Sequence, residues 1–382
     1  MHECSDSFQV LPEKTQGPRN MITVLAYYDR ISVFHTISPF FLNKYRPDFR
    51  FTQSIDFCLK RDKNKTLFME RLFLSRDPRD LRQDEFDALR RLRDKYETIV
   101  FFNGQPEAGP NRLDVLPFVD RFFDKSVFSD LENYRKPLYG KNLFADYYHK
   151  KYRITDEQTY LFKPSVSDAD ARRIELSWNI GVDGYPRRDF PQRLGAVIAR
   201  AGFPDAGRLF KARPLRKPAD FSGENRKIAV HARIDPVTCP SIAYQRRLFL
   251  QKIAEKQAKE TFLTGLTTQS HYYRELSDAK ITLSPFGWGE VCHRDFEAVI
   301  YGSLLLKPDM SHIKTYPDIY IPYETYVPLD WDGEDLFEKV DFYLSKETER
   351  QRIAQNAFEH YQKELAGLEN RFAELFEGRV FS

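Results

Sequence analysis

Short apolar runs rich in β-branched residues, separated by amphipathic stretches, constrain the fold of this chain most strongly. Met21–Tyr27 and Thr98–Phe102 are such runs in the first half, and Lys227–Arg233, Ala279–Ser284 and Ser303–Lys307 are their counterparts in the second. Each has the length and composition of a buried strand. Strands that alternate with helices predict parallel sheets with helical crossovers. The predicted fold class is therefore α/β, with two Rossmann-like domains that face each other across a cleft.

The chain is long enough for two domains, because 382 residues can bury two separate cores. A stretch rich in Pro, Gly, Arg and Lys falls between the two sets of strands and is typical of a linker. The predicted division is a tail over 1–20, a first α/β domain over 21–205, a linker over 206–226, a second α/β domain over 227–345 and a helical segment over 346–382. Less regular patterns predict strands over 49–57 and 119–128 and helices over 84–95, 167–178, 190–201 and 246–259.

Composition excludes several classes of protein. Hydrophobic residues make up 41% and charged residues 30% of the chain, as in ordinary globular proteins. The net charge of +3 lacks the basic excess of most nucleic-acid binders, so no nucleic-acid partner is expected. The four cysteines form no CxxC pair and fit reduced thiols in the cytoplasm. Without a signal peptide or a long apolar run, we expect a cytoplasmic protein, and peripheral contact with a membrane stays open.

The most informative segment is 284–306, which reads as a strand end, a glycine-containing loop, a helix, a glycine stop and another strand. Gly287 and Gly289 follow the strand, where ligands of open α/β sheets bind, and they allow backbone amides to approach a phosphate. The next helix directs its positive end to the same place, and Arg294 adds a cation. Glu290 and Glu297 are spaced to face one side, and a carboxylate there suits sugar hydroxyls. The alternative is a tight turn followed by a solvent-facing Glu297.

The run Arg294-Asp-Phe-Glu297-Ala298, followed by Gly302 and an apolar strand, resembles the donor-binding segment of the glycosyl transferases group 1 family. Exostosin-like transferases share a similar segment. The resemblance assigns Glu297 to the ribose of the donor and Glu290 to its sugar, where Glu290 is a candidate catalytic residue. Six residues separate the two glutamates here, where the family usually has seven.

The resemblance also implies a fold of the GT-B type, with a variable acceptor-binding domain first and a last helix that packs back onto it. It implies a transferase that moves a sugar from a nucleotide sugar to a hydroxyl of a glycan or glycolipid, in the synthesis of surface polysaccharide or lipopolysaccharide. Neither a cofactor nor a metal ion is expected. Two alternatives are a non-catalytic nucleotide- or glycan-binding protein and a phosphorylase or sugar-phosphate epimerase built on paired α/β domains.

A second group of candidate donor ligands is cationic. Arg233 ends a strand at the edge of the predicted cleft, and Arg246 follows on a helix, so both could hold a diphosphate where other transferases use a metal ion. The alternative for Arg246, and the preferred one for its neighbour Arg247, is a solvated helix face. His231 is interpreted as an ordinary sheet residue.

Acceptor-side candidates follow strands of the first half. Asp29 and His35 lie in one such loop and are candidate general bases, although Asp29 also suits a turn. Asn103, Gly104 and Gln105 lie in another.

Two other patterns have a structural interpretation. Asp168 and Asp170 have the DxD form of a manganese site, but they open a predicted helix that Ser167 or Asp168 caps. The aromatic and basic stretch 134–153 suits an anionic glycan or a membrane surface, and equally a solvated helix with buried rings, which we favour.

Overall fold

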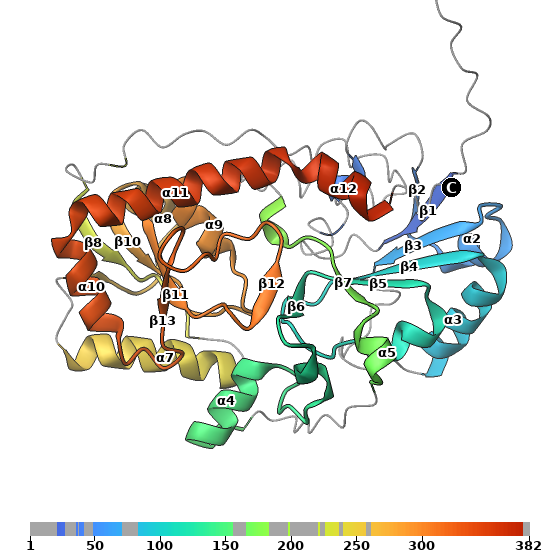
Figure 1. Cartoon of the computed structure of the whole chain (residues 1–382), viewed down its shortest axis with the longest axis horizontal. Coiled ribbons are helices and arrows are strands. Elements are labelled where there is room, and N and C mark those ends of the chain that lie inside the picture. Colours follow the sequence, from blue (N-terminus) through green and yellow to red (C-terminus); the bar gives the residue numbers. More distant parts are fainter. Residues whose placement is uncertain are drawn as a thin grey trace, which may run out of the picture.

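The computed structural model describes residues 21–26, 36, 38–41, 49–70, 83–155, 166–182, 198, 221, 226–236, 240–256 and 261–376. These residues form two parallel sheets that lie side by side along the long axis of the molecule (Figure 1). The predicted class, α/β with two Rossmann-like domains, is confirmed. The predicted tail, nearly all of the predicted linker and most of the helix predicted over 190–201 lie outside the described residues.

The first sheet has six parallel strands in the order β2-β1-β3-β4-β5-β7. Its central strands are almost wholly buried, because helices or loops cover both faces, and this explains their continuous apolar sequences. The strands are β1 (Ile22–Leu25), β2 (Phe49–Thr52), β3 (Thr66–Glu70), β4 (Thr98–Asn103), β5 (Arg121–Asp124) and β7 (Ile174–Leu176). The helices along this part of the chain are η1 (Ser38–Phe41), α2 (Ile55–Lys60), α3 (Gln83–Lys95), η3 (Leu113–Phe118), η4 (Leu131–Arg135), α4 (Leu143–Tyr152), α5 (Asp168–Ala171) and η5 (Ile180–Val182).

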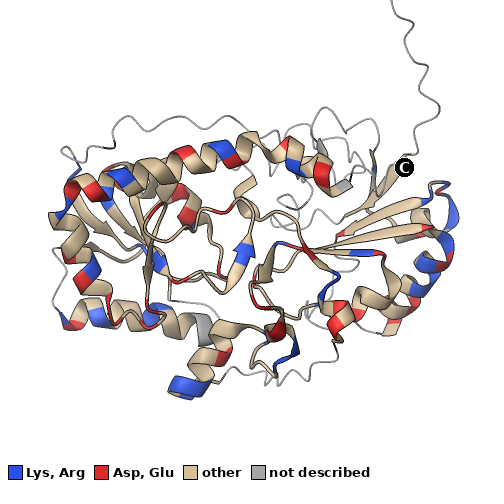
Figure 2. Cartoon of the chain, viewed as in Figure 1, with Lys and Arg blue, Asp and Glu red and all other residues tan. Residues whose placement is uncertain are grey.

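The second sheet has five parallel strands in the order β13-β11-β10-β8-β9. Its apolar side chains form a separate core with residues of α7, α10 and α11. The strands are β8 (Ile228–His231), β9 (Phe262–Leu263), β10 (Ala279–Leu283), β11 (Leu304–Pro308) and β13 (Val327–Leu329). The helices are α7 (Pro240–Glu255), α8 (Gln269–Ser277), α9 (His293–Ile300), α10 (Leu336–Ser345), α11 (Glu347–Ala366) and α12 (Leu368–Phe376). Charged residues of both signs occur along the outer helices of both domains (Figure 2).

Three sequence predictions are wrong in their local detail. The strand predicted over 119–128 is two strands, β5 and β6 (Ser126–Phe128), which belong to different sheets. The strand predicted over 49–57 ends at Thr52, because Ser54 accepts a hydrogen bond from the Phe57 amide and starts α2. The helix predicted over 167–178 ends after one turn, and β7 then completes the edge of the first sheet. Ser167 does cap the short helix, as predicted, by accepting a hydrogen bond from the Asp170 amide at 3.1 Å.

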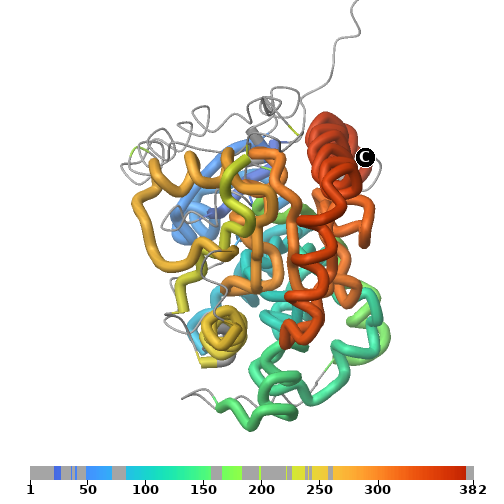
Figure 3. Tube along the Cα trace, turned by 90° about the vertical axis from the view of Figure 1, so that its left-hand side faces the viewer, coloured from blue at the N-terminus to red at the C-terminus, as the bar shows by residue number. Residues whose placement is uncertain are grey.

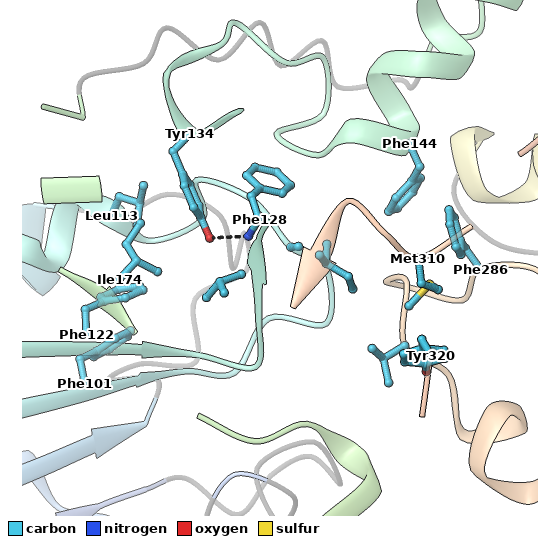
Figure 4. Close-up of a cluster of buried hydrophobic side chains, with 14 of the residues drawn as sticks. Phe101, Leu113, Phe122, Phe128, Tyr134, Phe144, Ile174, Phe286, Met310 and Tyr320 are labelled. Carbon is cyan, nitrogen blue, oxygen red and sulfur yellow. Dashed lines mark hydrogen bonds between the residues drawn. The ribbon is translucent and has the colours of Figure 1, made fainter. Parts of the chain in front are cut away.

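The two domains share one continuous hydrophobic cluster. It extends from Phe101 and Phe122 of the first sheet, through Phe128 and Tyr134, to Phe286 of the second domain (Figure 4). A small antiparallel sheet joins the domains within this region and pairs β6 (Ser126–Phe128) with β12 (Ile313–Thr315). We therefore expect the domain contact to contribute to stability as a core does, through buried apolar area.

Helix α4 belongs to the first half of the chain but packs against α7 of the second domain, a placement visible in two perpendicular views (Figures 1 and 3). The buried Tyr148 lies at this contact, and its hydroxyl accepts a hydrogen bond from Gln245 at 2.7 Å. Its ring packs on Tyr244, with the centroids 5.7 Å apart. Tyr134 of η4 and Tyr148 of α4 are fully buried, so the buried rings expected in stretch 134–153 are confirmed, although only its second half is an α-helix.

The C-terminal helices connect the two domains on another side. Helix α11 runs along the second domain and ends at Gly367, after which α12 lies over the first domain (Figure 1). Phe372 of α12 is fully buried against Phe40, at 5.4 Å between ring centroids, and against Trp178, at 5.7 Å. The described residues include no helix with the length and apolar character needed to cross a membrane.

Replacing Asp332 by Ala should loosen α4 from the second domain. The buried Asp332 carboxylate accepts hydrogen bonds from the hydroxyls of Tyr147 at 3.1 Å and Tyr152 at 2.9 Å, and it pairs with Lys151. Lys151 is half exposed, so its charge is screened and most of the loss comes from the two hydroxyls. We expect the free energy of unfolding, measured in urea, to fall by about 1–3 kcal/mol. Asp341→Ala, at an exposed position on α10, is the control and should change it by less than about 0.5 kcal/mol; equal effects of both substitutions would contradict the prediction.

Candidate functional site

The loop between β10 and α9 is a tight turn that packs against Cys292 of its own domain and against Pro106 of the first domain. The Gly287 amide donates to the Gly289 carbonyl at 2.9 Å. A Cβ atom on Gly287 would lie 2.8 Å from the Cys292 sulfur, and one on Gly289 only 1.9 Å from the carbonyl oxygen of Pro106. Gly289 is therefore required for the close approach of a first-domain backbone, which the sequence did not indicate.

Helix α9 begins after this loop and ends where the sequence predicts. Gly302 adopts a φ of +70°, and its amide donates to the Val299 carbonyl at 3.1 Å, so the chain leaves the helix and enters β11. This geometry fixes the position of Arg294 in the first turn and of Glu297 one turn later, on the same side of the helix.

Two guanidinium groups bind backbone carbonyls of the glycine-containing loop. Arg294 donates to the Pro285 carbonyl at 2.9 Å and to the Ser284 hydroxyl at 3.2 Å. Arg246, which is almost buried, donates to the Phe286 carbonyl at 3.0 Å. No carboxylate of the described chain lies within ion-pair distance of Arg294, so its charge is available to an anionic ligand. The solvated alternative for Arg246 is wrong, because its side chain is buried against this loop.

Glu297 is buried on the same helix as Arg294. Its two carboxylate oxygens accept hydrogen bonds from Tyr272 at 2.9 Å and Tyr273 at 3.1 Å, both on α8. Burial raises the pKa of Glu297, while the two tyrosines and the charge of Arg294 oppose the shift. The alternative in which Glu297 faces solvent is wrong. A carboxylate has about four acceptor positions, so two remain for other hydroxyl groups.

Arg233 and His231 form a paired group at the end of β8. Arg233 donates twice to Glu275, at 2.9 and 2.6 Å, and once to the Thr264 carbonyl. His231 is fully buried 3.4 Å from the same carboxylate, and burial lowers the pKa of this imidazole to about 4. His231 is thus a buried sheet residue, as interpreted, and Glu275 already compensates the charge of Arg233.

Glu290 connects the two domains. Its fully buried carboxylate accepts a hydrogen bond from the Ala108 amide of the first domain at 3.0 Å and lies 3.4 Å from the Nε2 atom of His312. The carboxylate of the predicted catalytic Glu290 is thus bound by the backbone of the first domain. Its role in catalysis stays a prediction. Asp29 and His35, the candidate bases, lie outside the described residues.

The carboxyl ends of the first sheet hold polar residues that the sequence reasoning missed. Asp124, at the end of β5, is fully buried and accepts hydrogen bonds from Asn103 at 3.1 Å and from the Lys125 amide at 2.8 Å. Burial raises the pKa of Asp124 to about 8. The side-chain amide of Asn111 is also fully buried and has no hydrogen-bond partner among the described residues. The rule that selected Asn103, a polar residue at a strand end, would have found Asp124 too.

Sequence comparison assigns the second half of the chain. Residues 238–377 match the family model described as glycosyl transferase-like. This part of the chain is therefore similar to glycosyl transferase-like proteins. The predicted resemblance to glycosyltransferases is thereby confirmed, and the family segment contains the glycine-containing loop, Arg294 and Glu297. A search of proteins with curated functions finds no match.

Several solved structures are similar to the chain as a whole. An alpha-glucosyltransferase in complex with UDP has 10% sequence identity and a TM-score of 0.46, with 94% of this chain and 98% of that chain covered. HepE from Anabaena in complex with UDP has 8% identity and a TM-score of 0.45, with 93% and 99% covered. A glycosyltransferase from Rickettsia africae has 8% identity and a TM-score of 0.45, with 94% and 98% covered.

One sequence prediction about partners needs correction. The balanced charge of the chain was taken to exclude a nucleic-acid partner. Two structures of the similar alpha-glucosyltransferase are complexes with DNA, one of them with UDP-glucose and DNA containing an abasic site. Net charge alone is therefore an insufficient reason for that exclusion, because a local surface and not the whole chain binds a partner.

Gly289→Ala should separate the loop from the first domain. Its Cβ atom would overlap backbone atoms of Pro106 and Glu107, which cannot move aside as a flexible side chain can. We expect a loss of about 1–3 kcal/mol in the free energy of unfolding. Gly367→Ala makes the same chemical change where a Cβ atom would have only ordinary contacts, of 3.5 Å or more, and should be tolerated. Similar urea midpoints for Gly289→Ala and the unmodified protein would refute the close approach.

The pH dependence of stability should report on Asp124. Its ordinary pKa is 3.8 and its pKa in the folded protein is about 8, so between these values the folded state holds a proton that the unfolded state releases. Stability from this group is therefore complete below about pH 4 and is lost as the pH rises to about 8, at up to about 1.4 kcal/mol per pH unit. Asp124→Asn should remove this decline, seen as a pH-dependent difference between the two proteins in urea unfolding. A constant difference from pH 4 to pH 8 would contradict the assignment.

Proposed function

We propose that the protein transfers a sugar from a nucleotide sugar to a hydroxyl group of a glycan or glycolipid acceptor, in the synthesis of a surface polysaccharide or lipopolysaccharide. The observation that carries the proposal is the arrangement on α9. Arg294 presents a guanidinium with no carboxylate partner in the described chain, and one helical turn away Glu297 presents a buried carboxylate. Together they suit the phosphates and the ribose of one ligand. The match of this segment to glycosyl transferase-like proteins supports the same conclusion.

The donor diphosphate would lie on the glycine-containing loop. Arg294 and Arg246 are oriented there by carbonyls of residues 285 and 286, so their positions are fixed before a ligand binds. Negative charge grows on the diphosphate as the bond to the sugar breaks, and preorganised cations stabilise that charge in the transition state. We propose that these guanidinium groups do the work of the metal ion used by other transferases, with no cofactor.

Glu297 would bind the ribose. Tyr272 and Tyr273 already donate to its two oxygens and hold the carboxylate in one orientation. The remaining acceptor positions can receive the two ribose hydroxyls, which is the role that the family resemblance implies. A neutral amide in its place would keep the shape of the side chain and lose the charge that strengthens such hydrogen bonds.

The acceptor would bind from the first domain. The backbone at Pro106 contacts the glycine-containing loop and follows the buried polar end of β4, where Asn103 bonds to Asp124 of β5, so an acceptor held there would lie next to the donor sugar. The unpaired amide of Asn111 supports a polar ligand on this side. We also propose that one of three residues takes part in catalysis: Glu290 at the donor sugar, or Asp29 or His35 as a general base for the acceptor hydroxyl.

The test combines nucleotide binding with turnover. A thermal-shift series with UDP, GDP and ADP and with UDP-glucose, GDP-mannose and ADP-glucose should identify a ligand that raises the melting temperature of the protein, since a ligand of the folded state stabilises it by about 2.7 kcal/mol at 100 times its Kd. Glu297→Gln and Arg294→Gln should each weaken that ligand about ten-fold or more and reduce release of the nucleoside diphosphate. Arg274→Ala, which removes an exposed guanidinium from α8, is the control and should leave both unchanged.

The outcomes separate the possible functions. If no nucleotide changes the melting temperature of the unmodified protein, the donor site is refuted. If a nucleotide sugar binds through Glu297 but is neither transferred nor hydrolysed, the domain is a non-catalytic binding protein.

A further inference from the structure

Trp288 is an exposed aromatic residue at the tip of the glycine-containing loop. Its side chain is 68% exposed, whereas Trp178 is fully buried and Trp331 is partly buried, with its indole N–H donated to the Asp309 carbonyl. Single exposed apolar side chains are common on protein surfaces, so it is the place of Trp288, on the glycine-containing loop, that points to a function.

The backbone around Trp288 is fixed, although its side chain is free. Phe286 and Glu290 on either side are fully buried. The two adjacent glycines are joined by the hydrogen bond between Gly287 and Gly289, and Gly289 rests on the first-domain backbone. A ligand that covers the indole would therefore lose little binding free energy to ordering of the loop.

The surroundings of Trp288 indicate the kind of ligand. On one side, a Cβ atom of Gly287 would lie 3.7 Å from a terminal nitrogen of Arg246, one of the two cations assigned to the phosphates. On the other side, Gly289 contacts Pro106 and Glu107 of the first domain. Trp288 thus emerges between the phosphate region and the acceptor-side domain, while the proposed ribose ligand Glu297 lies farther along α9.

We propose that Trp288 is a stacking platform for a pyranose ring, with the C–H face of the sugar lying on the indole. This inference rests on the proposed function, because the phosphates of the donor must lie on the same loop. The apolar face of a pyranose can cover an indole while its hydroxyls stay in water or reach the polar residues of the first domain. The pyranose ring belongs either to the donor sugar or to the acceptor, and the experiment below distinguishes these two ligands.

The experiment compares Trp288→Ala and Trp288→Phe with the unmodified protein, and with Phe342→Ala as a control that removes an exposed ring from α10. Dissociation constants are measured for UDP, GDP, UDP-glucose and GDP-mannose, and for maltose, cellobiose and lactose in the presence of the nucleoside diphosphate that binds. Tryptophan emission is recorded in each titration. In the unmodified protein, a bound sugar should shift the emission to shorter wavelength as the indole leaves water.

We expect Trp288→Ala to bind a sugar-bearing ligand about ten-fold more weakly and the nucleoside diphosphate as well as before, while Trp288→Phe keeps most of the affinity. A loss confined to the nucleotide sugar assigns the ring to the donor, and a loss confined to a disaccharide assigns it to the acceptor. Equal weakening of UDP or GDP would overturn the proposal in favour of a base platform. Unchanged affinity for every sugar, or no sugar binding by the unmodified protein, would overturn it too, whereas failure to bind any nucleotide would refute the donor site itself.

Discussion

A buried ion pair between Asp295 and Lys307 holds the second domain's site together. Both side chains are fully buried, and the Asp295 carboxylate lies 3.0 Å from the Lys307 ammonium. The same carboxylate accepts hydrogen bonds from the Cys292 amide at 2.8 Å and the Tyr320 hydroxyl at 2.7 Å, and from the hydroxyl of Ser284. A buried charge is costly unless it is paired and hydrogen-bonded, and here every partner comes from a different part of the site. The end of β10, the start of α9, the strand β11 and the loop before β13 are thereby fixed relative to one another.

The two carboxylates of α9 show how position decides chemistry. Asp295 lies on the side of the helix toward Lys307, where it is neutralised and structural. Glu297 lies on the side toward α8, where two tyrosine hydroxyls donate to it. The nearby Arg294 donates to two oxygens of the loop but has no carboxylate of the described residues within ion-pair distance. Without a paired charge of its own, Glu297 keeps capacity for a ligand. In α9, Asp295 therefore stabilises the fold, whereas Glu297 is oriented by the fold and can bind a ligand.

The contact between the two domains places the first domain next to the glycine-containing loop of the second. A continuous apolar cluster, the hydrogen bond from Ala108 to Glu290 and the docking of α4 on α7 hold the first domain against the glycine-containing loop. This contact explains why position 289 is a glycine, since a Cβ atom there would overlap the backbone at Pro106. The chemistry of sugar transfer needs two substrates in adjacent positions, and the proposed donor and acceptor regions meet at this loop.

The sequence by itself determined what depends on local pattern. The apolar runs over 98–102, 279–284 and 303–307 predict buried strands, and the glycines, Arg294 and Glu297 stand in an order that predicts a ligand loop at a strand end. These signals are local, since a strand or a helix terminus is specified within about ten residues. Only the tertiary structure decided which groups are already paired. Glu275 neutralises Arg233 from 42 residues away, and Ala108 reaches Glu290 across 182 residues. Burial that arises from such contacts raises the pKa of Asp124, and pairing with β5 makes β7 a strand where the local pattern predicts a helix. Packing between distant segments, and not local propensity, sets the environment of each of these side chains.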